Sequence, residues 1–317
     1  MAALLTVPGQ MLDAGSAMLN SLGGNWRQSG ARVSCRAMNR SRAGRGLGAK
    51  SDGSPFGRLL REWRGRRGFS QLDLALSART TQRHLSFVES GRASPSRDMV
   101  LRLGATMALP LRQQNALLLA AGYAPAWQER DLSTPDLAAV NSALDYMLAH
   151  HEPYPAFVVD RCWNLLRVNR GALNLTEFLT GPARADAPSE KVNLAVALVS
   201  PDGLRPYIVN WQEVVLYFVR GVRADADADG APATASLLSR LLGFPGVPAL
   251  SEMLPPEEDQ APVLPIHFRR DDTSLRLFTT IATLGTPRDV TVEDIRIEFF
   301  FPMDEPTAQA FRRLASR

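Results

Sequence analysis

Residues 70–92 carry the pattern of two short helices joined by a tight turn, and this pattern limits the fold more than any other feature. Ser70 and Asp73 form an S-x-x-D capping box, which predicts that a helix begins at this point. Thr80 or Thr81 can cap the next helix through its hydroxyl group. In a helix-turn-helix with this spacing, the second helix lies in the major groove of DNA. The segment therefore predicts a small helical domain whose partner is double-stranded DNA.

Further helices flank this pattern on both sides. An apolar stripe at positions i, i+3, i+4 and i+7 predicts the first helix, and its residues are Phe56, Leu59, Leu60 and Trp63. The other boundaries are set by glycines that end helices and by prolines and a serine that start them, namely Gly68, Gly91, Pro95, Ser96, Pro110 and Gly122. We therefore predict an all-α domain of five helices over residues 54–122.

One face of the second helix of the pattern carries side chains that can read bases. They are Gln82, Arg83, Ser86 and Phe87. Gln pairs with N6 and N7 of adenine, Arg with O6 and N7 of guanine, and Phe contacts the thymine methyl group. We expect these four side chains to face the base edges.

A second set of residues is placed to hold phosphates. Gln71 begins the first helix of the pattern, where its amide and the helix N–H groups can bind a phosphate. Arg92, Ser94 and Arg97 follow the second helix and would flank the groove. Such contacts fix the register of a protein on DNA without reading its sequence.

The charges are distributed unevenly along the chain. Residues 1–135 hold 19 Lys and Arg against 8 Asp and Glu, whereas residues 136–317 hold 17 against 24. Within residues 54–122 there are 11 basic and 4 acidic side chains. A basic first half joined to an acidic second half is typical of a nucleic-acid-binding domain followed by a domain that does not bind nucleic acid.

Residues 55–122 resemble the helix-turn-helix domain of the Xre family, the type of the phage lambda and 434 repressors. The motif S-Q-x-x-L-A followed by T-x-R-x-L-S-x-x-E-S-G-R-x-x-P-S carries the resemblance. It implies that Gln71 grips a phosphate. It also implies that Gln82, Arg83 and Phe87 face bases.

The same resemblance implies a structural ion pair between Glu89 and Arg64. One departure is Arg79, which stands at a turn position where the family favours Gly. A positive φ at this residue would cost about 1 kcal/mol of strain. The alternative for the whole domain is a helical bundle that binds a protein.

After a linker over residues 123–135, the second half mixes helices and strands. We expect helices near residues 136–149, 171–180, 190–199, 210–223 and 233–243, with an acidic loop at 225–229. We expect strands near 156–160, 164–168, 263–269, 275–284 and 295–301, where apolar residues alternate with other residues or form short runs. This order predicts an α+β domain over residues 136–317, with one antiparallel sheet and helices on one face.

This second domain resembles the ligand-binding domain of MmyB-like transcription regulators, a PAS-like α+β sensor. The matching stretches are residues 153–166, 206–214, 244–248, 278–291 and 299–305. The resemblance implies a sensor for a small molecule, with fatty acids as the expected class.

A sheet covered by helices can leave an apolar cavity between the two layers. The candidate lining residues are Tyr154, Phe157, Trp163, Trp211, Phe218, Phe278 and Phe299. The alternative is that these aromatic side chains simply fill the core. Arg276 and Arg296 are candidate anchors for a ligand carboxylate, or else solvated strand residues.

Residues 1–53 are rich in Gly, Ser, Arg and Asn and predict a disordered basic tail. Met38 is an alternative to Met1 as the translation start, and the first 24 residues lack the pattern of a secretion signal. No apolar run approaches the roughly 20 residues of a membrane span. With only Cys35 and Cys162, we expect a reducing, cytoplasmic location, at the bacterial nucleoid.

The sequence offers no arrangement of residues that predicts catalysis. Neither cysteine lies at metal-ligand spacing from a histidine, and no nucleophile or dinucleotide motif occurs. We therefore expect no enzyme, no metal and no cofactor, apart from a non-covalent ligand resembling a fatty acid.

The combined prediction is a transcription regulator that binds operator DNA as a homodimer and senses a small apolar ligand. Two alternatives stay open. The second domain could serve only to dimerise or to recruit a protein, or the chain could be an enzyme with a helical targeting domain. A cavity open to solvent favours the sensor, a filled core favours the scaffold, and clustered polar groups favour the enzyme.

Overall fold

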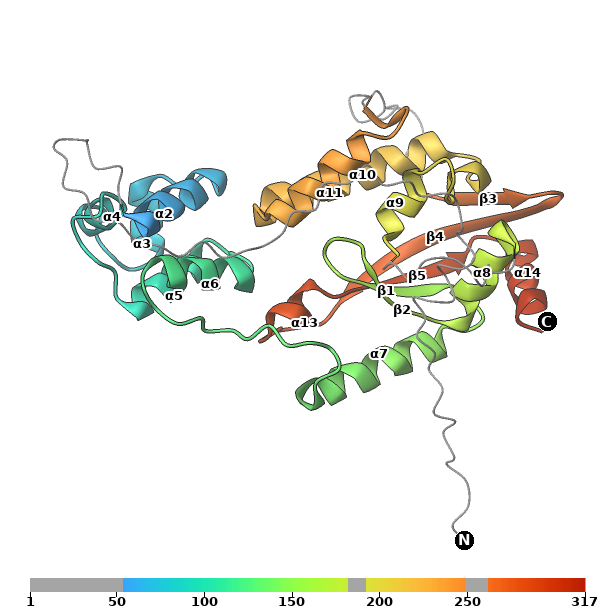
Figure 1. Ribbon diagram of the computed structural model, residues 1–317, viewed down its shortest axis with the longest axis horizontal. Helices are drawn as coiled ribbons and strands as arrows, with labels where there is room; N and C mark the ends of the chain where they lie inside the picture. The colour runs from blue at the N-terminus through green and yellow to red at the C-terminus, as the bar shows by residue number, and fades with distance from the viewer. Residues whose placement is uncertain (1–53, 182–191, 249–261, 317) are drawn as a thin grey trace, which may run out of the picture. The chain divides into compact units, whose positions relative to one another are not determined.

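The computed structural model describes residues 54–181, 192–248 and 262–316 (Figure 1). The chain divides into two units at the bond between Trp127 and Gln128. The first unit is helical, and the second is built on a β-sheet. The predicted basic tail over residues 1–53 and the alternative start at Met38 lie outside the described residues.

The described part of the first unit is all-α with five helices, as predicted. They are α2 (Pro55–Arg66), α3 (Gln71–Ser77), α4 (Gln82–Glu89), α5 (Arg97–Thr106) and α6 (Leu111–Ala120). Side-chain hydroxyls accept the N–H groups that have no partner inside the first turn of a helix. The capping residues are Ser54, Ser70, Thr81 and Ser96. The predicted capping box forms in both directions, because the Asp73 side chain also accepts the Ser70 N–H.

The apolar stripe of α2 packs into the core of this unit. Leu60 is fully buried, Phe56 and Trp63 are nearly so, and Leu59 packs at the edge. Leu85 and Val88 of α4 face the same core and are both 0% exposed. This packing fixes which face of α4 remains at the surface.

Two backbone features set the positions of α3 and α4. Arg79, in the turn between them, has a φ of 53°, a conformation that favours glycine. The first turn of α2 approaches the end of α4 so closely that a Cβ atom at Gly57 would lie 2.3 Å from the carbonyl oxygen of Glu89. Only glycine leaves room for this contact.

The second unit contains a five-stranded antiparallel sheet in the order β2-β1-β5-β4-β3. The strands are β1 (Ala156–Val159), β2 (Leu165–Val168), β3 (Ile266–Arg270), β4 (Thr273–Thr283) and β5 (Arg296–Pro302). The central strand, β5, is therefore paired along both of its edges. Glu298 lies opposite Phe157 of β1 on one side and opposite Ile281 of β4 on the other.

The described helices of this unit are mostly of one to three turns, with one longer helix, α10. They are η1 (Pro135–Leu137), α7 (Ala138–His150), α8 (Arg170–Thr180), α9 (Leu194–Val199), η2 (Arg205–Tyr207), α10 (Trp211–Asp229), α11 (Pro232–Leu242), α13 (Val290–Asp294) and α14 (Glu305–Ala315). The α+β class with one antiparallel sheet is thus confirmed.

Helices cover both faces of the sheet, so the prediction of helices on one face was wrong. Phe157 and Val159 of β1 belong to the larger core, which includes residues of α8, α9, α10 and α14. The alternate residue Val158 packs with Leu144 and Leu148 of α7 in a second core. Figure 1 shows α7 along the sheet on the side away from α10. All four residues of β1 are buried because the strand has a core on each side.

The predicted acidic loop is instead the last turns of α10. Asp225 accepts two hydrogen bonds from Arg296 of β5. Asp229 accepts hydrogen bonds from Thr234 and from Arg161. The two arginines are 71 and 68 residues away from their aspartates, so the local charge pattern could not reveal these pairs.

Most of the segment predicted to be a linker, residues 123–135, forms contacts within one of the two units. Asn115 holds the backbone of residues 126–127 through three hydrogen bonds, which belong to the helical unit. In the sheet unit, Gln128 forms a β-bridge with Asp289, and Arg130 forms an ion pair with the same residue at 2.9 Å.

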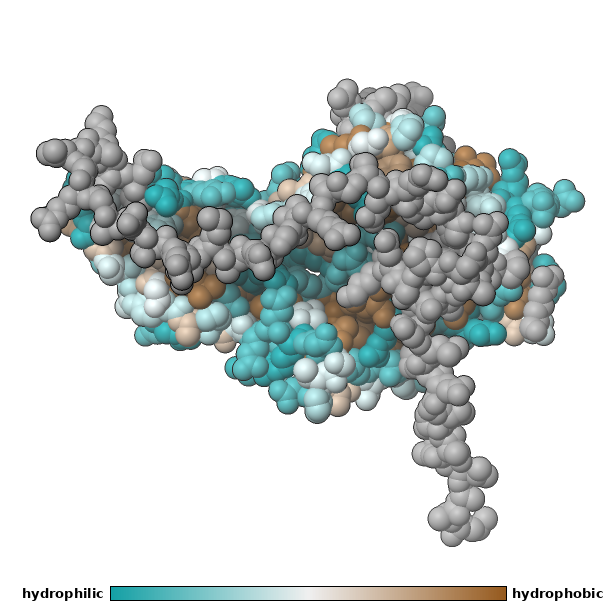
Figure 2. All heavy atoms as spheres, in the orientation of Figure 1, coloured by the Kyte–Doolittle hydropathy of each residue, from teal (hydrophilic) through white to brown (hydrophobic). Residues whose placement is uncertain are grey.

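The surface carries hydrophilic and hydrophobic side chains in mixture. On the face shown in Figure 2, apolar patches lie between hydrophilic ones. None of the helices in the described residues is long and apolar enough to cross a lipid bilayer.

Candidate functional site

The four predicted base-reading residues lie on α4. Gln82 and Arg83 are exposed, and Ser86 and Phe87 are half-buried. The Arg83 guanidinium carbon lies 5.4 Å from the centroid of the Phe87 ring. This contact restricts the Arg83 side chain before any DNA is bound. Because Leu85 and Val88 anchor the opposite face of α4, the four side chains form the outer face of the helix.

The predicted phosphate-binding residues are also at the surface. Arg92, Ser94 and Arg97 are exposed in the loop after α4 and at the start of α5. Gln71 is half-buried at the start of α3. Its side-chain amide donates one hydrogen bond to the Glu89 carboxylate, at 2.8 Å. An amide group has a second N–H, which leaves one donor for a phosphate.

The Glu89 carboxylate joins helices α2, α3 and α4. Arg64 of α2 donates from Nε to Oε1 at 2.6 Å and from Nη2 to Oε2 at 3.2 Å. Gln71 of α3 donates to the same Oε2 atom. Arg61 donates to the Glu89 backbone carbonyl at 3.2 Å. The ion pair implied by the Xre resemblance therefore has a bidentate geometry in the structure.

This ion pair is almost inaccessible to solvent. The Glu89 side chain is 1% exposed, and the Arg64 side chain is 16% exposed. A charge in such a place is costly unless its hydrogen bonds are satisfied, and here each carboxylate oxygen has at least one donor. Since Glu89 is the last residue of α4, the network fixes the end of the candidate base-reading helix.

A cavity of about 310 Å³ lies in the sheet unit between the sheet and the helices of its larger core. Strands β1, β3, β4 and β5 and helices α8, α9 and α10 contribute to its wall. The wall is mainly apolar, with Leu175, Leu179, Leu194, Leu198, Leu204, Val214, Leu264, Ile266 and Ile281 among its aliphatic members. This volume lies at the lower end of the range for small-molecule sites, roughly 300–1,000 Å³.

Three of the seven predicted lining residues contribute to this wall, namely Phe157, Trp163 and Phe218. The other four do not line the cavity. Tyr154 stacks edge-on against Phe311 of α14. The Trp211 indole N–H donates to the Leu198 carbonyl, and the Arg205 guanidinium covers its ring at 3.7 Å.

Phe278 and Phe299 lie on the sheet face opposite the cavity. Phe278 stacks on Phe301, and Phe299 packs against the smaller core beneath α7. The cavity is instead lined from β5 by Phe300 and Glu298 and from β4 by Thr279. The alternation along β4 already predicts that residues 278 and 279 face opposite sides of the sheet. We chose Phe278 because it is a large aromatic residue, and it lies on the face away from the cavity.

The two candidate carboxylate anchors are not among the lining residues. Arg296 forms a bidentate pair with Asp225, at 2.6 and 2.7 Å. Arg276 is exposed and lies 3.9 Å from Asp304. Arg296 is thus satisfied by the protein itself.

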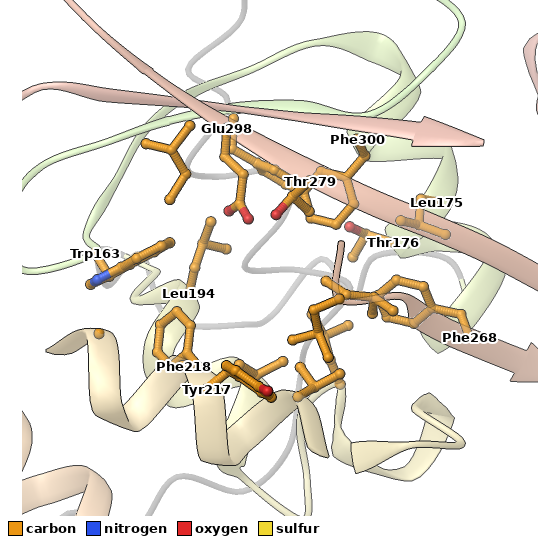
Figure 3. A pocket seen from close by; sticks show the side chains of 18 of the residues that line it. Trp163, Leu175, Thr176, Leu194, Tyr217, Phe218, Phe268, Thr279, Glu298 and Phe300 are labelled. Carbon is orange, nitrogen blue, oxygen red and sulfur yellow. The ribbon is translucent and has the colours of Figure 1, made fainter. Parts of the chain in front are cut away.

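The carboxyl group in the cavity wall was not among the site residues predicted from the sequence. Glu298 points into the cavity beside Thr279, as Figure 3 shows. Burial raises the pKa of Glu298 to about 7, and a hydrogen bond with the Thr279 side chain opposes this shift. The sequence did contain a signal for this group. Glu298 stands between Ile297 and Phe299 in a strand, so its side chain points to the opposite face of the sheet from theirs.

Two further kinds of reactive group in the described residues are metal-ligating side chains and the Cys162 thiol. In residues 54–181, 192–248 and 262–316, no three His, Cys, Asp or Glu side chains are placed to hold a metal ion. Burial raises the pKa of the Cys162 thiol, which lowers its reactive thiolate fraction.

Two known protein families match the chain. Residues 55–117 match the helix-turn-helix domain, and residues 140–314 match the MmyB-like transcription regulator ligand binding domain. These are regulatory DNA-binding and ligand-binding domains, not enzyme families. No curated protein matches the chain. The second match covers more than half of the chain, which therefore belongs to the family of MmyB-like transcription regulators, with a helix-turn-helix domain preceding the ligand-binding domain.

Proposed function

We propose that this regulator reads its operator with the outer face of α4 and senses a small apolar ligand in the cavity of the sheet unit. The cavity is the observation that carries the sensor assignment. A scaffold whose second unit only dimerised or recruited a protein would have no need of such a space. The proposal assigns no catalytic step to either unit.

For DNA binding, we propose an Xre-type arrangement. Gln82, Arg83, Ser86 and Phe87 would contact bases, because they share the one exposed face of α4. Gln71, Arg92, Ser94 and Arg97 would hold phosphates on either side of the groove. The basic excess over residues 54–122 supports this assignment, since phosphate contacts dominate the affinity for DNA.

Arg83→Ala is expected to weaken operator binding by about 1–3 kcal/mol and to relax the preference at one base pair. Arg97→Ala is expected to weaken binding to all sequences alike and to reduce the salt dependence by about one counterion. The operator would first be selected from a random DNA library, and fluorescence anisotropy would then compare it with each single-base variant. If both substitutions reduce affinity equally on operator and random DNA, Arg83 does not read a base.

For sensing, we propose a non-covalent apolar ligand, and the family resemblance makes fatty-acid-like molecules the first class to test. Leu194→Trp should fill part of the cavity, because Leu194 lies in its wall (Figure 3). Native mass spectrometry of the protein purified from its host should show a co-purified ligand on the unmodified chain, and at least about ten-fold less on this variant.

The matched control is Tyr146→Trp, which enlarges a side chain that is 63% exposed on α7. It should leave ligand occupancy unchanged. Equal occupancy in all three proteins would show that the ligand binds outside this cavity.

We further propose that the PAS-like sheet unit acts on DNA binding through a homodimer in the bacterial cytoplasm, at the nucleoid. A two-fold dimer presents two α4 helices to two half-sites of an operator. For the ligand to regulate, it must bind more tightly to one dimer geometry than to another. The same mass spectra would report the oligomeric state.

A further inference from the structure

We propose that the ligand of this cavity is an apolar molecule with a cationic head, such as an alkylammonium ion, and that the Glu298 carboxylate binds this head. The inference rests on the sensing function proposed above and names the ligand class. It differs from the fatty-acid expectation, in which the head group would be an anion.

The position of Glu298 is the first argument. Its strand is the centre of the sheet, so its backbone is held by β1 and β4 together. Its side chain points into the cavity beside Thr279, with which it shares a hydrogen bond (Figure 3). A ligand that fills the apolar space would therefore meet this carboxyl group.

The described wall of the cavity supplies no cation to Glu298. The cavity wall in the described residues contains no Lys, Arg or His. Arg296 precedes Glu298 by two positions on the same face of β5, but Asp225 of α10 binds it through both oxygens. The other titratable side chain of the described wall is Tyr217 of α10. The polar group that α8 contributes to this wall is the Thr176 hydroxyl, which donates to the Ala172 carbonyl.

The charge of Glu298 depends on the group that lies beside it. Burial raises its pKa to about 7, so near neutral pH the group exchanges readily between its neutral and charged forms. An ammonium ion beside it would stabilise the carboxylate and lower this pKa. A ligand carboxylate would instead meet a like charge, with no cation from the described wall to compensate.

Because ligand binding and proton binding at Glu298 are coupled, the direction in which the ligand affinity changes with pH can be predicted. At pH 6, about one unit below the pKa of Glu298, most molecules of the free protein hold a proton on this group, and binding of an ammonium ion must release it. The affinity for an amine should therefore rise about ten-fold from pH 6 to pH 8, as Glu298 ionises. The affinity for an alkyl carboxylate should fall over the same range, and that for an alcohol should change little.

The test uses the full chain, stripped of co-purified lipid, and three chain-matched probes: decylammonium, decanol and decanoate. Isothermal titration calorimetry at pH 6 and pH 8 should show decylammonium binding at least about ten-fold more tightly than decanoate at pH 8. In buffers of different ionisation enthalpy, decylammonium binding at pH 6 should release nearly one proton. Decanol should bind with similar affinity at both pH values.

Two variants separate the head group from the cavity. Glu298→Gln keeps the size of the side chain and one acceptor oxygen but removes the charge. It should weaken decylammonium binding about ten-fold, abolish proton release, and leave decanol binding nearly unchanged. Leu194→Trp should weaken binding of all three probes.

The outcomes distinguish this inference from the proposed function. If decanoate binds as tightly as decylammonium, or if Glu298→Gln leaves decylammonium affinity unchanged, the cationic ligand is ruled out while the cavity remains a ligand site. If none of the probes binds and no apolar ligand co-purifies with the protein, the sensing function fails as well.

Discussion

Glu89→Ala is expected to lower the free energy of unfolding of the helical unit by about 3 kcal/mol. The substitution leaves the Arg64 guanidinium, which is 16% exposed, without its buried partner. It also removes the acceptor of the Gln71 amide. For a unit of this size, the melting temperature should fall by more than about 10 °C. Scanning calorimetry of the full chain would measure the shift, and hydrogen exchange would assign it to residues 54–127.

Glu62→Ala is the matched control for this prediction. Glu62 pairs with Arg66 at 2.7 Å along α2, but both side chains are well exposed, at 53% and 39%. Exposed pairs of this kind contribute about 0–1 kcal/mol. If the two glutamate variants melt at the same temperature, the Glu89 network does not stabilise the unit.

The Glu89 variant should also lose specific DNA binding, although Glu89 is not expected to touch DNA. Its carboxylate holds the end of α4 and the start of α3, which carry the proposed base and phosphate contacts. Operator affinity, measured well below the new melting temperature, should therefore fall more than affinity for random DNA. If the affinities for operator and random DNA fall by the same factor, the Glu89 network stabilises the unit but does not position α4 for specific binding.

Gly57→Ala is expected to destabilise the same unit by about 3 kcal/mol, the upper end of the usual cost of overpacking. The added Cβ would lie 2.3 Å from the Glu89 carbonyl oxygen and 2.9 Å from that of Val88. Both contacts are to backbone, so no side-chain rotation can relieve them. The helices α2 and α4 must separate, and α4 would move away from the position proposed for DNA binding.

Gly65→Ala provides a control within the same helix. A Cβ at Gly65 meets no atom within 4 Å. Replacing an unhindered helical glycine with Ala should stabilise the unit by about 0.5–1 kcal/mol. Calorimetry would thus show shifts of opposite sign for the two glycine variants. A Gly57 variant that melts with the unmodified protein would mean that the contact between α2 and α4 relaxes at little cost.

The helical unit could be predicted from sequence because its signals are local. Ser70 and Asp73 are three residues apart, and the apolar stripe of α2 spans two turns. The contact of Arg64 with Glu89 is not local, and only the family resemblance brought these two residues together.

The cavity was harder to predict because its wall depends on which face of each strand is turned toward α10. In β5, the run Phe299, Phe300 and Phe301 is apolar throughout, so hydrophobicity does not show the alternation. A second core on the far side of the sheet also buries aromatic residues, so aromatic size did not mark the cavity face. Glu298 was overlooked because only basic residues, Arg276 and Arg296, were considered as anchors for the expected carboxylate ligand.

The alternation of β5 also has an evolutionary consequence. Glu298 and Phe300 face the cavity, whereas Ile297 and Phe299 pack in the core beneath α7. Along this short strand, alternate codons therefore have different effects. One set changes the side chains that line the cavity, and the other set changes the core on the opposite face of the sheet. Descendants of this protein could change the molecule they respond to one codon at a time, without disturbing the packing that holds the other side of the sheet.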